Sequence, residues 1–275
     1  MAHQRNIALV NDLTGYGRCS LTVELPIISA LKVQACVLPT AILSVHTGFP
    51  SYYLDDYTDR MTPYIKSWQT NHITFDGIST GFLGSARQID IVLDFITKFK
   101  RAETKVIVDP VMGDHGKIYA SYTPVMCDEM RRLLAYADVV TPNITEGCQL
   151  TGMSYKPEDT WTDRELTEMA NALTAKGPAQ VVITGIHREN QIGNFVYERG
   201  QEPQWVWHDV VGHDRSGTGD VFAAIVSAGV VKGEPLVHSV TKAADFIATC
   251  LAYTETLGTP SQCGLAFEEF LTTLR

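Results

Sequence analysis

The sequence predicts an α/β protein with a mostly parallel central sheet that is covered by helices on both faces. Short β-branched apolar runs alternate with amphipathic segments along most of the chain. Several of these runs end directly on a polar residue, as in "KVIVDP" and "DVVTPN". Strands that are apolar throughout are typical of parallel sheets buried between helical layers. No repeat, low-complexity stretch or linker divides the 275 residues, so a single domain over 1–275 is expected.

The first half of the chain alternates strand-like and helical segments. In the clearest helical segment, Ile89, Val92 and Ile96 recur at helical spacing. The predicted strands are 6–11, 33–40 and 75–80, and the predicted helices are 19–32, 52–69 and 85–100.

The second half continues this alternation and adds a hairpin. Thr162 precedes Glu165 by three residues, which is the capping-box pattern of a helix start. Two alternating runs around "GQE" indicate an antiparallel hairpin. The predicted strands are 105–110, 138–143 and 180–185, the hairpin arms are 191–199 and 203–211, and the helices are 123–137, 162–177, 217–231, 235–254 and 264–274.

Composition and charge exclude several classes of partner. The formal net charge is −9 and no basic cluster stands out, which argues against nucleic acid as a partner. The longest nearly apolar run, 221–231, is too short to span a bilayer, and the first residues lack the pattern of a signal peptide. The six cysteines are scattered without metal-ligand spacing. We therefore expect a cytoplasmic protein with no membrane partner.

The sequence lacks the motifs of several large enzyme classes. The first strand runs into "NDLTGYGRCS" rather than the G-x-G-x-x-G turn of dinucleotide-binding folds. Neither the G-x-x-x-x-G-K-[ST] phosphate loop nor the G-x-S-x-G nucleophile turn occurs. Hydride transfer and P-loop chemistry therefore have no support in the sequence.

The strongest functional signal is "SGTGD", residues 216–220. A glycine-rich turn that opens a helix directs free N–H groups at one point, where the helix dipole also favours an anion. Asp220 at the end of the turn is placed to accept a proton from an attacking hydroxyl group. The structural alternative is that Asp220 only favours the helix dipole. The apolar helical segment that follows Asp220 favours the functional interpretation.

Other candidate residues follow predicted strands, where ligands bind in such sheets. Asn11 and Asp12, Asp109, Thr141 and Asn143, and Thr184 all end a strand in this prediction. Glu146 follows Asn143 by one short turn, where its carboxylate could hold a magnesium-bound water. The alternatives are a turn-forming Asp109 and a helix cap made by Asn143 with Glu146.

Histidines give weaker signals. His46 and Thr47 lie in a polar turn after a strand, where a lone histidine is as often structural as functional. His208 and His213 superficially resemble a metal site, but their spacing fits no zinc pattern and strand alternation explains them better.

Together, these motifs resemble the ribokinase superfamily and, within it, the pyridoxal (vitamin B6) kinases. The resemblance covers nearly the whole chain in order, and "HTG" and "GFLGS" are typical of the B6 branch. The segments that carry it are "NDLTGYGR…ELP", "SVHTGF", "STGFLGSARQ", "VDPVMGD", "TPNITE", "VVITG" and "GTGD".

The resemblance implies a ribokinase-like three-layer sandwich, with a small β-hairpin near the nucleotide site, that uses ATP and Mg²⁺ to phosphorylate a B6 vitamer. It implies that Asp220 is the base and that the amides of Gly217, Thr218 and Gly219 bind the γ-phosphate. A monovalent cation such as K⁺ and a homodimer are also implied. The resemblance implies that the B6 ring is contacted by Asp12, His46 and Thr47. It implies that the ATP phosphates and magnesium are surrounded by Asp109, Thr141, Asn143 and Glu146, with Asp109 and Glu146 holding the metal through water. The residues implied to lie along the nucleotide are Thr184, His208, Asp209, Val210 and Val211.

Three positions depart from the family pattern. The family often has serine at the position of Asp12, asparagine at Val45 and tyrosine at Phe82. An ionised aspartate only accepts hydrogen bonds, whereas serine also donates them. The hypothesis is that Asp12 favours a protonated ring nitrogen or an amine, so that pyridoxamine or pyridoxine is used at least as well as pyridoxal.

Three other functions compete with this interpretation. Hydroxymethylpyrimidine kinase shares "DPVM" and the glycine-rich turn. A sugar kinase is disfavoured because no extended substrate lid is evident near the start. A non-catalytic B6- or nucleotide-binding protein is disfavoured because Asp220 is retained.

Overall fold

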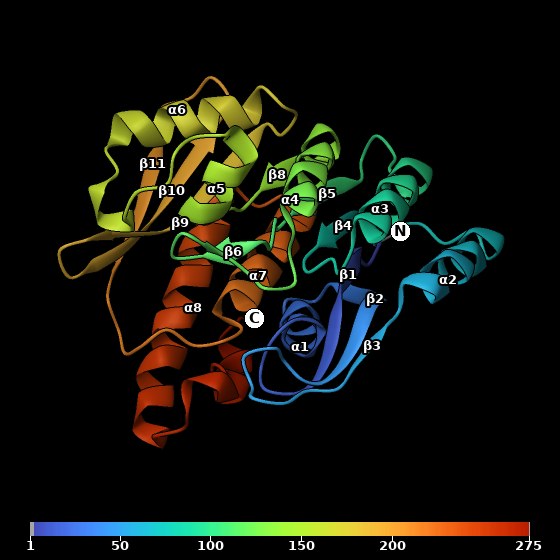
Figure 1. Cartoon of the computed structure of the whole chain (residues 1–275), viewed down its shortest axis with the longest axis horizontal. Helices are drawn as coiled ribbons and strands as arrows, with labels where there is room; N and C mark the ends of the chain where they lie inside the picture. Colours follow the sequence, from blue (N-terminus) through green and yellow to red (C-terminus); the bar gives the residue numbers. More distant parts are fainter. Residues whose placement is uncertain (1–2, 275) are drawn as a thin grey trace.

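The protein is built on one twisted nine-stranded sheet. The computed structural model describes residues 3–274, and the strand order is β11-β10-β9-β8-β5-β4-β1-β2-β3 (Figure 1). The strands are β1 (Asn6–Tyr16), β2 (Gln34–Val45), β3 (Leu54–Asp56), β4 (Gly77–Thr80), β5 (Lys105–Val108), β8 (Val139–Val140), β9 (Gln180–Arg188), β10 (Gln191–Glu198) and β11 (Gln204–Asp209).

The centre of the sheet is parallel and its two edges are antiparallel. Strands β2, β1, β4, β5, β8 and β9 pair in parallel, as predicted. The predicted hairpin is confirmed, since β10 and β11 pair antiparallel at one edge, and β3 pairs antiparallel with β2 at the other. A separate small hairpin follows β5, formed by β6 (Gly113–Asp114) and β7 (Lys117–Ile118).

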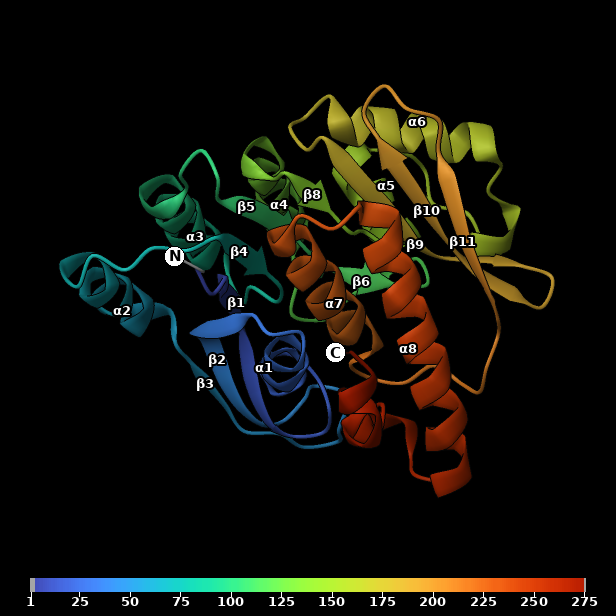
Figure 2. The same ribbon diagram turned by 180° about the vertical axis from the view of Figure 1, so that it is seen from behind.

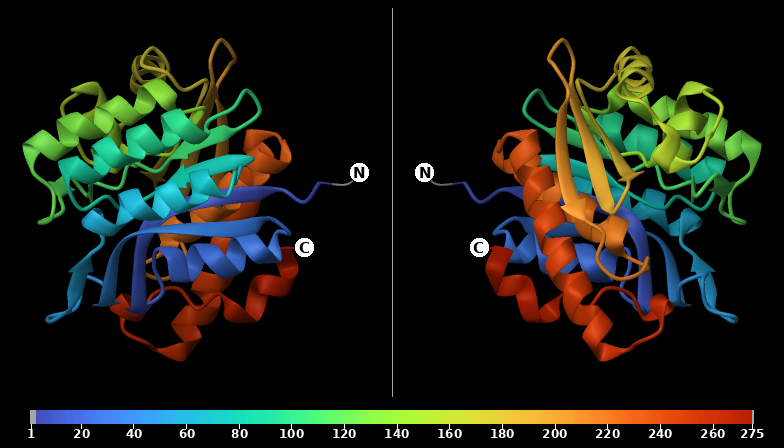
Figure 3. Two further views of the ribbon diagram at one scale, coloured as in Figure 1. Left: turned by 90° about the vertical axis from the view of Figure 1, so that its right-hand side faces the viewer. Right: turned by 90° about the vertical axis from the view of Figure 1, so that its left-hand side faces the viewer.

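Helices cover both faces of the sheet, which confirms the predicted three-layer sandwich. Two apolar clusters lie on opposite faces, since Ile7 and Leu9 of β1 belong to one and Ala8 and Val10 to the other. Figures 2 and 3 show α1, α7 and α8 on one face and α2 to α6 on the other. The helices are α1 (Leu21–Ala30), α2 (Thr58–Thr70), α3 (Ala86–Phe99), α4 (Pro124–Met130), α5 (Ile144–Thr151), α6 (Asp163–Thr174), α7 (Thr218–Lys232) and α8 (Leu236–Leu257).

Helix α7 lies in the middle of its layer. Every side chain from Val221 to Val231 is buried, because the helix packs on the sheet and also against α1 and α8. Gly77 of β4 allows this close approach, since a Cβ atom there would lie 2.3 Å from Val231. The N-terminus of α7 is thereby fixed relative to the ends of the central strands. Within residues 3–274, no helix is long and apolar enough to cross a membrane.

The first strand was predicted too short, and Asn11 and Asp12 do not end it. Strand β1 pairs with β4 only from Ile7 to Val10, but it continues beside β2 to Tyr16 after an irregularity between Asn11 and Leu13. Asn11 and Asp12 therefore lie where β4 stops and β1 continues. Beyond Val10, β1 and β2 form a ribbon that continues past the end of β4, with β3 paired on its outer side.

Three predicted helices were too long. The segment 52–69 begins with strand β3, and helix α2 starts only at Thr58, whose backbone N–H donates to the Asp56 side chain. The segment 123–137 changes from α4 to a 3₁₀ helix, η1 (Arg131–Tyr136). The segment 264–274 is helical only as the 3₁₀ helix η4 (Glu268–Leu274). Helical spacing does not distinguish these tighter turns from α-helix.

Candidate active site

The ends of the central strands form one continuous row of polar residues. One residue beyond each strand, a backbone N–H still donates to the neighbouring strand: Gly81 to Val10, Asp109 to Thr80, and Thr141 to Val108. A bridge between Asn143 and Thr184 extends the row to β9, which continues to Arg188, so Thr184 lies within its strand and does not end it as predicted. Asn11, Asp109, Thr141, Asn143 and Thr184 therefore lie along the same sheet edge, where parallel sheets bind ligands.

The glycine-rich turn opens helix α7 beside this row. Gly217 is the N-cap residue, with φ 81°. The Thr218 hydroxyl group and, at 3.5 Å, its backbone N–H both donate to the Arg215 carbonyl oxygen. The backbone N–H groups of Gly217, Gly219 and Asp220 have no backbone partner within residues 3–274. The turn therefore presents free N–H groups at the positive end of a 15-residue helix, which suits an anion.

Asp220 is half-buried next to this turn. The backbone N–H of Ser20 donates to its carboxylate, and Asn11 Nδ2 lies 3.5 Å from its Oδ1. Burial is the main cause that raises the pKa of Asp220 to about 6, and repulsion from Asp12 adds to the rise. Asp220 is therefore ionised at neutral pH, but it is a stronger base than an exposed aspartate.

Asp12 is buried and already hydrogen-bonded. Ser20 Oγ donates to its Oδ1 at 2.6 Å and Thr14 Oγ1 donates to its Oδ2 at 2.7 Å. Only 6% of the residue is exposed, and burial raises the pKa of its carboxyl group. Any contact to a ligand would therefore use the remaining lone pairs of oxygens that the protein holds fixed.

Asp109 and Glu146 form a second acidic pair, after Asp12 and Asp220, at the carboxyl ends of the parallel strands. Glu146 closes a capping box with Asn143 and accepts a second backbone hydrogen bond from Met112, so the helix-cap alternative is confirmed for both residues. Asp109 has one long contact, 3.5 Å from Thr141 Oγ1. Burial and repulsion from Asp220 raise the pKa of Asp109 to about 8, and burial and Asp109 raise that of Glu146. Within the described chain, no Lys or Arg hydrogen-bonds to either carboxylate.

Sequence reasoning missed two residues of this site. Ser20 joins Asp12 to Asp220, by its hydroxyl group and its backbone N–H, and holds a positive φ of 54° that only a few non-glycine residues adopt. Tyr119 follows strand β7 and is 45% exposed as a residue, but desolvation of its hydroxyl group and then the Glu146 carboxylate raise the pKa of that group. Neither residue belongs to a glycine-rich motif or ends a strand of the central sheet.

His46 and Thr47 lie at the far end of the β1–β2 ribbon. His46 Nε2 is 2.8 Å from the Gln262 carbonyl oxygen, and its ring packs against Gly17 and Phe49. Thr47 is exposed in the turn after β2. His46 acts electrostatically on Asp12, which places the ribbon tip on the Asp12 side of the site.

The segment from His208 to Val211 contains the last residues of β11, the outermost strand of the sheet, and the start of the loop that follows it. His208 Nε2 is 2.7 Å from Asp245 Oδ1 on helix α8, and Val210 is largely exposed. The loop after Val211 leads into the glycine-rich turn. His213 contacts a different acid, Glu255, so the two histidines do not share a metal site.

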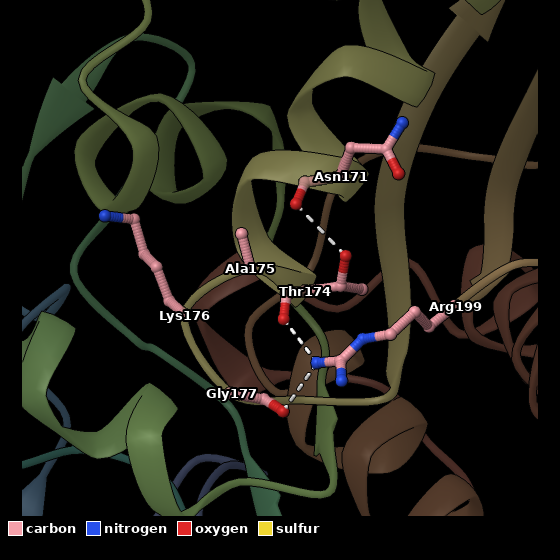
Figure 4. Close-up of a pocket in the computed structure, with 6 residues that line it drawn as sticks. All are labelled: Asn171, Thr174, Ala175, Lys176, Gly177 and Arg199. Atoms are coloured by element: carbon pink, nitrogen blue, oxygen red, sulfur yellow. Dashed lines mark hydrogen bonds between the residues drawn. The ribbon is translucent and has the colours of Figure 1, made fainter.

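A shallow pocket lies at the end of helix α6, where the Arg199 side chain caps the helix rather than forming a ligand site. Figure 4 shows Arg199 directed at the backbone carbonyl groups of Thr174 and Gly177. Arg199 also donates to the Pro178 carbonyl oxygen at 3.0 Å. The guanidinium group therefore satisfies the carbonyl group of Thr174, the last residue of the helix, and two carbonyl groups of the loop that follows it.

The site as a whole combines an anion-binding turn with clustered carboxylates. Burial and then repulsion from a neighbouring acid raise the pKa values of Asp109, beyond β5, and of Asp220, in the first turn of α7. Oxygen donors without a neighbouring cation are the ligand set that a hard cation such as Mg²⁺ prefers. The arrangement suits a reaction that brings an anion and a divalent cation together.

Comparison with known proteins places the chain in a family. The sequence pattern of the phosphomethylpyrimidine kinase family matches residues 24–263. The chain belongs to this family. This match and the similarity to pyridoxal kinases confirm the predicted relationship to kinases of B6 vitamers and hydroxymethylpyrimidine, which phosphorylate alcohol groups. Similarity to solved structures confirms the predicted ribokinase-like fold.

Some relatives are named for pyridoxal and others for hydroxymethylpyrimidine or phosphomethylpyrimidine. A protein of Bacteroides thetaiotaomicron, described as a phosphomethylpyrimidine kinase, is 38% identical and has a TM-score of 0.96 over 99% of this chain and 94% of its own. One of its crystal forms, 37% identical, contains pyridoxal. The pyridoxal kinase of Arabidopsis thaliana is 29% identical over 66% of this chain, and a hydroxymethylpyrimidine/phosphomethylpyrimidine kinase of Haemophilus influenzae is 30% identical over 65%. The chain spans 60% and 65% of the lengths of these two curated relatives.

Proposed function

We propose that this protein is an ATP-dependent kinase that phosphorylates the 5′-hydroxymethyl group of a vitamin B6 vitamer. The observation that carries the proposal is Asp220, a half-buried carboxylate of raised pKa directly beside the free N–H groups that open helix α7. The crystal form of the 37% identical Bacteroides relative with pyridoxal supports a B6 vitamer as the substrate.

In the proposed reaction, the protein positions the reactants and stabilises charge. Asp220 accepts the proton of the hydroxymethyl group as its oxygen attacks the γ-phosphorus of ATP. A new O–P bond forms, and the bond between the γ-phosphorus and the bridging oxygen of ADP breaks. The free N–H groups of Gly217, Gly219 and Asp220 bind the transferred phosphoryl group, on which negative charge is spread in the transition state. Asp12, His46 and Thr47 are the proposed contacts to the B6 ring.

The acids of the sheet edge fit a role in binding Mg²⁺. Asp109 retains free lone pairs, and Glu146, fixed by two backbone N–H groups, would act through a bound water. When bound, Mg²⁺ supplies positive charge that neutralises the ATP phosphates. Thr141, Asn143 and Thr184 lie in the same row and are the proposed polar contacts to the nucleotide, together with 208–211.

Hydroxymethylpyrimidine is the second candidate substrate. The family pattern and the Haemophilus influenzae relative favour it, and its reacting group is also a hydroxymethyl group on a heterocycle. The two candidates share the same base, anion-binding turn and metal ligands, so only the ring contacts distinguish them. These contacts lie around Asp12, Phe82 and the ribbon tip.

A substrate panel tests the proposed function. ATP consumption is measured with pyridoxal, pyridoxamine, pyridoxine and hydroxymethylpyrimidine, and the product is identified as the 5′-phosphate. We expect turnover with the B6 vitamers, and pyridoxamine or pyridoxine used at least as well as pyridoxal. The Asp12→Ser variant should shift preference toward pyridoxal, because serine can donate a hydrogen bond. Turnover of hydroxymethylpyrimidine alone would reassign the substrate, and binding of ATP or a vitamer without turnover would indicate a non-catalytic protein.

The rate should depend on pH through Asp220. Because this carboxyl group must be ionised to accept a proton, activity is lost when pH falls through its raised pKa of about 6. Below that pH we expect kcat/KM to fall by about tenfold per pH unit, as for titration of a single base. A profile measured with saturating Mg²⁺ checks this, and a flat rate down to about pH 5 would contradict Asp220 as the base.

A further inference from the structure

Glu24 is a buried acid that the proposed reaction does not use. It lies in the first turn of helix α1 and is only 3% exposed. Asn11 Nδ2 donates to its Oε1 at 3.2 Å, whereas its Oε2 is buried and has no hydrogen-bond partner within the described chain. A buried carboxyl oxygen without a partner is rare and calls for an explanation.

Asn11 links Glu24 to Asp220 in a fixed orientation. Its Oδ1 accepts from the backbone N–H groups of Asp12 and Phe82, both at 2.9 Å, which identifies the side-chain oxygen and prevents the amide from flipping. Gly81 packs against the same amide, since a Cβ atom there would lie 2.5 Å from Nδ2. The amide nitrogen therefore faces two acceptors, Glu24 at 3.2 Å and Asp220 at 3.5 Å.

The surroundings of Glu24 disfavour a negative charge. The titratable groups that act on it are Asp220 from α7, Asp109 after β5 and Asp12 from β1, all of them acids. An ionised carboxylate that is buried without a cation costs far more free energy than a neutral one. Burial and then Asp220 raise the pKa of Glu24 well above its ordinary value.

We propose that Glu24 is a positioning residue for Asp220, a neutral carboxyl group that engages the Asn11 amide and so limits how strongly this amide binds the Asp220 carboxylate. The inference rests on the proposed function. Without Glu24, Asp220 is the remaining acceptor within 3.5 Å of Asn11 Nδ2 among residues 3–274. The amide would then draw the Asp220 carboxylate closer, and a stronger hydrogen bond would make that carboxylate a weaker and displaced base.

Two substitutions separate this role from a charged one. Glu24→Gln keeps an acceptor for Asn11 and adds no charge, so we expect kcat within about twofold of wild type and an unchanged pH midpoint. Glu24→Leu removes the acceptor, so we expect kcat to fall by at least about tenfold through misplacement of the base. Its pH midpoint should move to lower pH. A merely structural role would lower stability without moving that midpoint.

A spectroscopic measurement completes the test and needs no substrate. The infrared difference spectrum of wild type minus Glu24→Gln at pH 7 should show the carbonyl stretch of a protonated carboxyl group. Absence of that band, a loss of tenfold or more in Glu24→Gln, or wild-type kcat and midpoint in Glu24→Leu would each overturn the proposal. Because the infrared result does not depend on turnover, it tests Glu24 even if the panel shows that the proposed function is wrong.

Discussion

Replacing Asp220 by asparagine is expected to lower kcat by at least about a hundredfold, the lower range for loss of a general base. Asparagine has nearly the same shape and still accepts hydrogen bonds from Ser20 and Asn11, but it cannot take up a proton. The KM for ATP should change little, because the free N–H groups of the turn are main-chain groups. The measurement is steady-state phosphorylation of the best substrate of the panel, with ATP and Mg²⁺ saturating.

The same variant gives a stability readout that separates catalysis from misfolding. Because the folded-state pKa of Asp220 is raised, ionisation of this carboxyl group opposes folding once the pH exceeds its ordinary range. Asp220→Asn should therefore melt at an equal or higher temperature than wild type above about pH 6, and this advantage should fade at lower pH. Asp214→Asn is the matched control, since Asp214 is an exposed acid in the loop that leads into α7. A near-normal rate for Asp220→Asn would remove Asp220 from the mechanism.

The sheet edge was predictable because its signals are local. Apolar strands that end on Asp109 or Thr141 indicate both the parallel sheet and the ligand-binding edge, and the glycines before Asp220 indicate a helix N-terminus. The structure brings Asp109, Thr141, Asn143 and Thr184 into one row, as this logic requires. Local patterns were sufficient here because Asp109 and Thr141 directly follow the strands that position them, while Thr184 lies within β9 beside Asn143.

The connections between the acids were not predictable, because they join segments that are distant in the sequence. Asn11 and Asp220 are 209 positions apart in the sequence. From the sequence alone, Glu24 is an ordinary charged residue of an early helical turn, and only the structure shows that its side chain is buried. Strand β1 extends to Tyr16 because it pairs with β2. The polar residues after Val10 do not show the apolar pattern of a buried strand, so this extension was not predicted. Tertiary pairing overrides local propensity at these positions.

Gly217 is the position in the glycine-rich turn where replacing glycine by alanine should distort the backbone most. Its φ of 81° lies in the left-handed region, which costs an alanine about 1–2 kcal/mol. A Cβ atom would also lie 1.9 Å from the backbone carbonyl oxygen of Arg18. The backbone near Arg18 would have to move, and this segment leads directly to Ser20, which holds both Asp12 and Asp220. Such overpacking costs about 1–3 kcal/mol more.

Gly217→Ala is therefore expected to lower both the melting temperature and kcat, with a rate loss of about a hundredfold for displaced catalytic groups. Gly219→Ala is the matched variant two residues later, where φ is ordinary and a Cβ atom meets no atom within 4 Å. Because alanine favours the first turn of helix α7, that variant should be as stable as wild type or more stable. Its rate should stay well above that of Gly217→Ala. Equal melting temperatures and equal rates for the two variants would show that the shape of this turn does not organise the site.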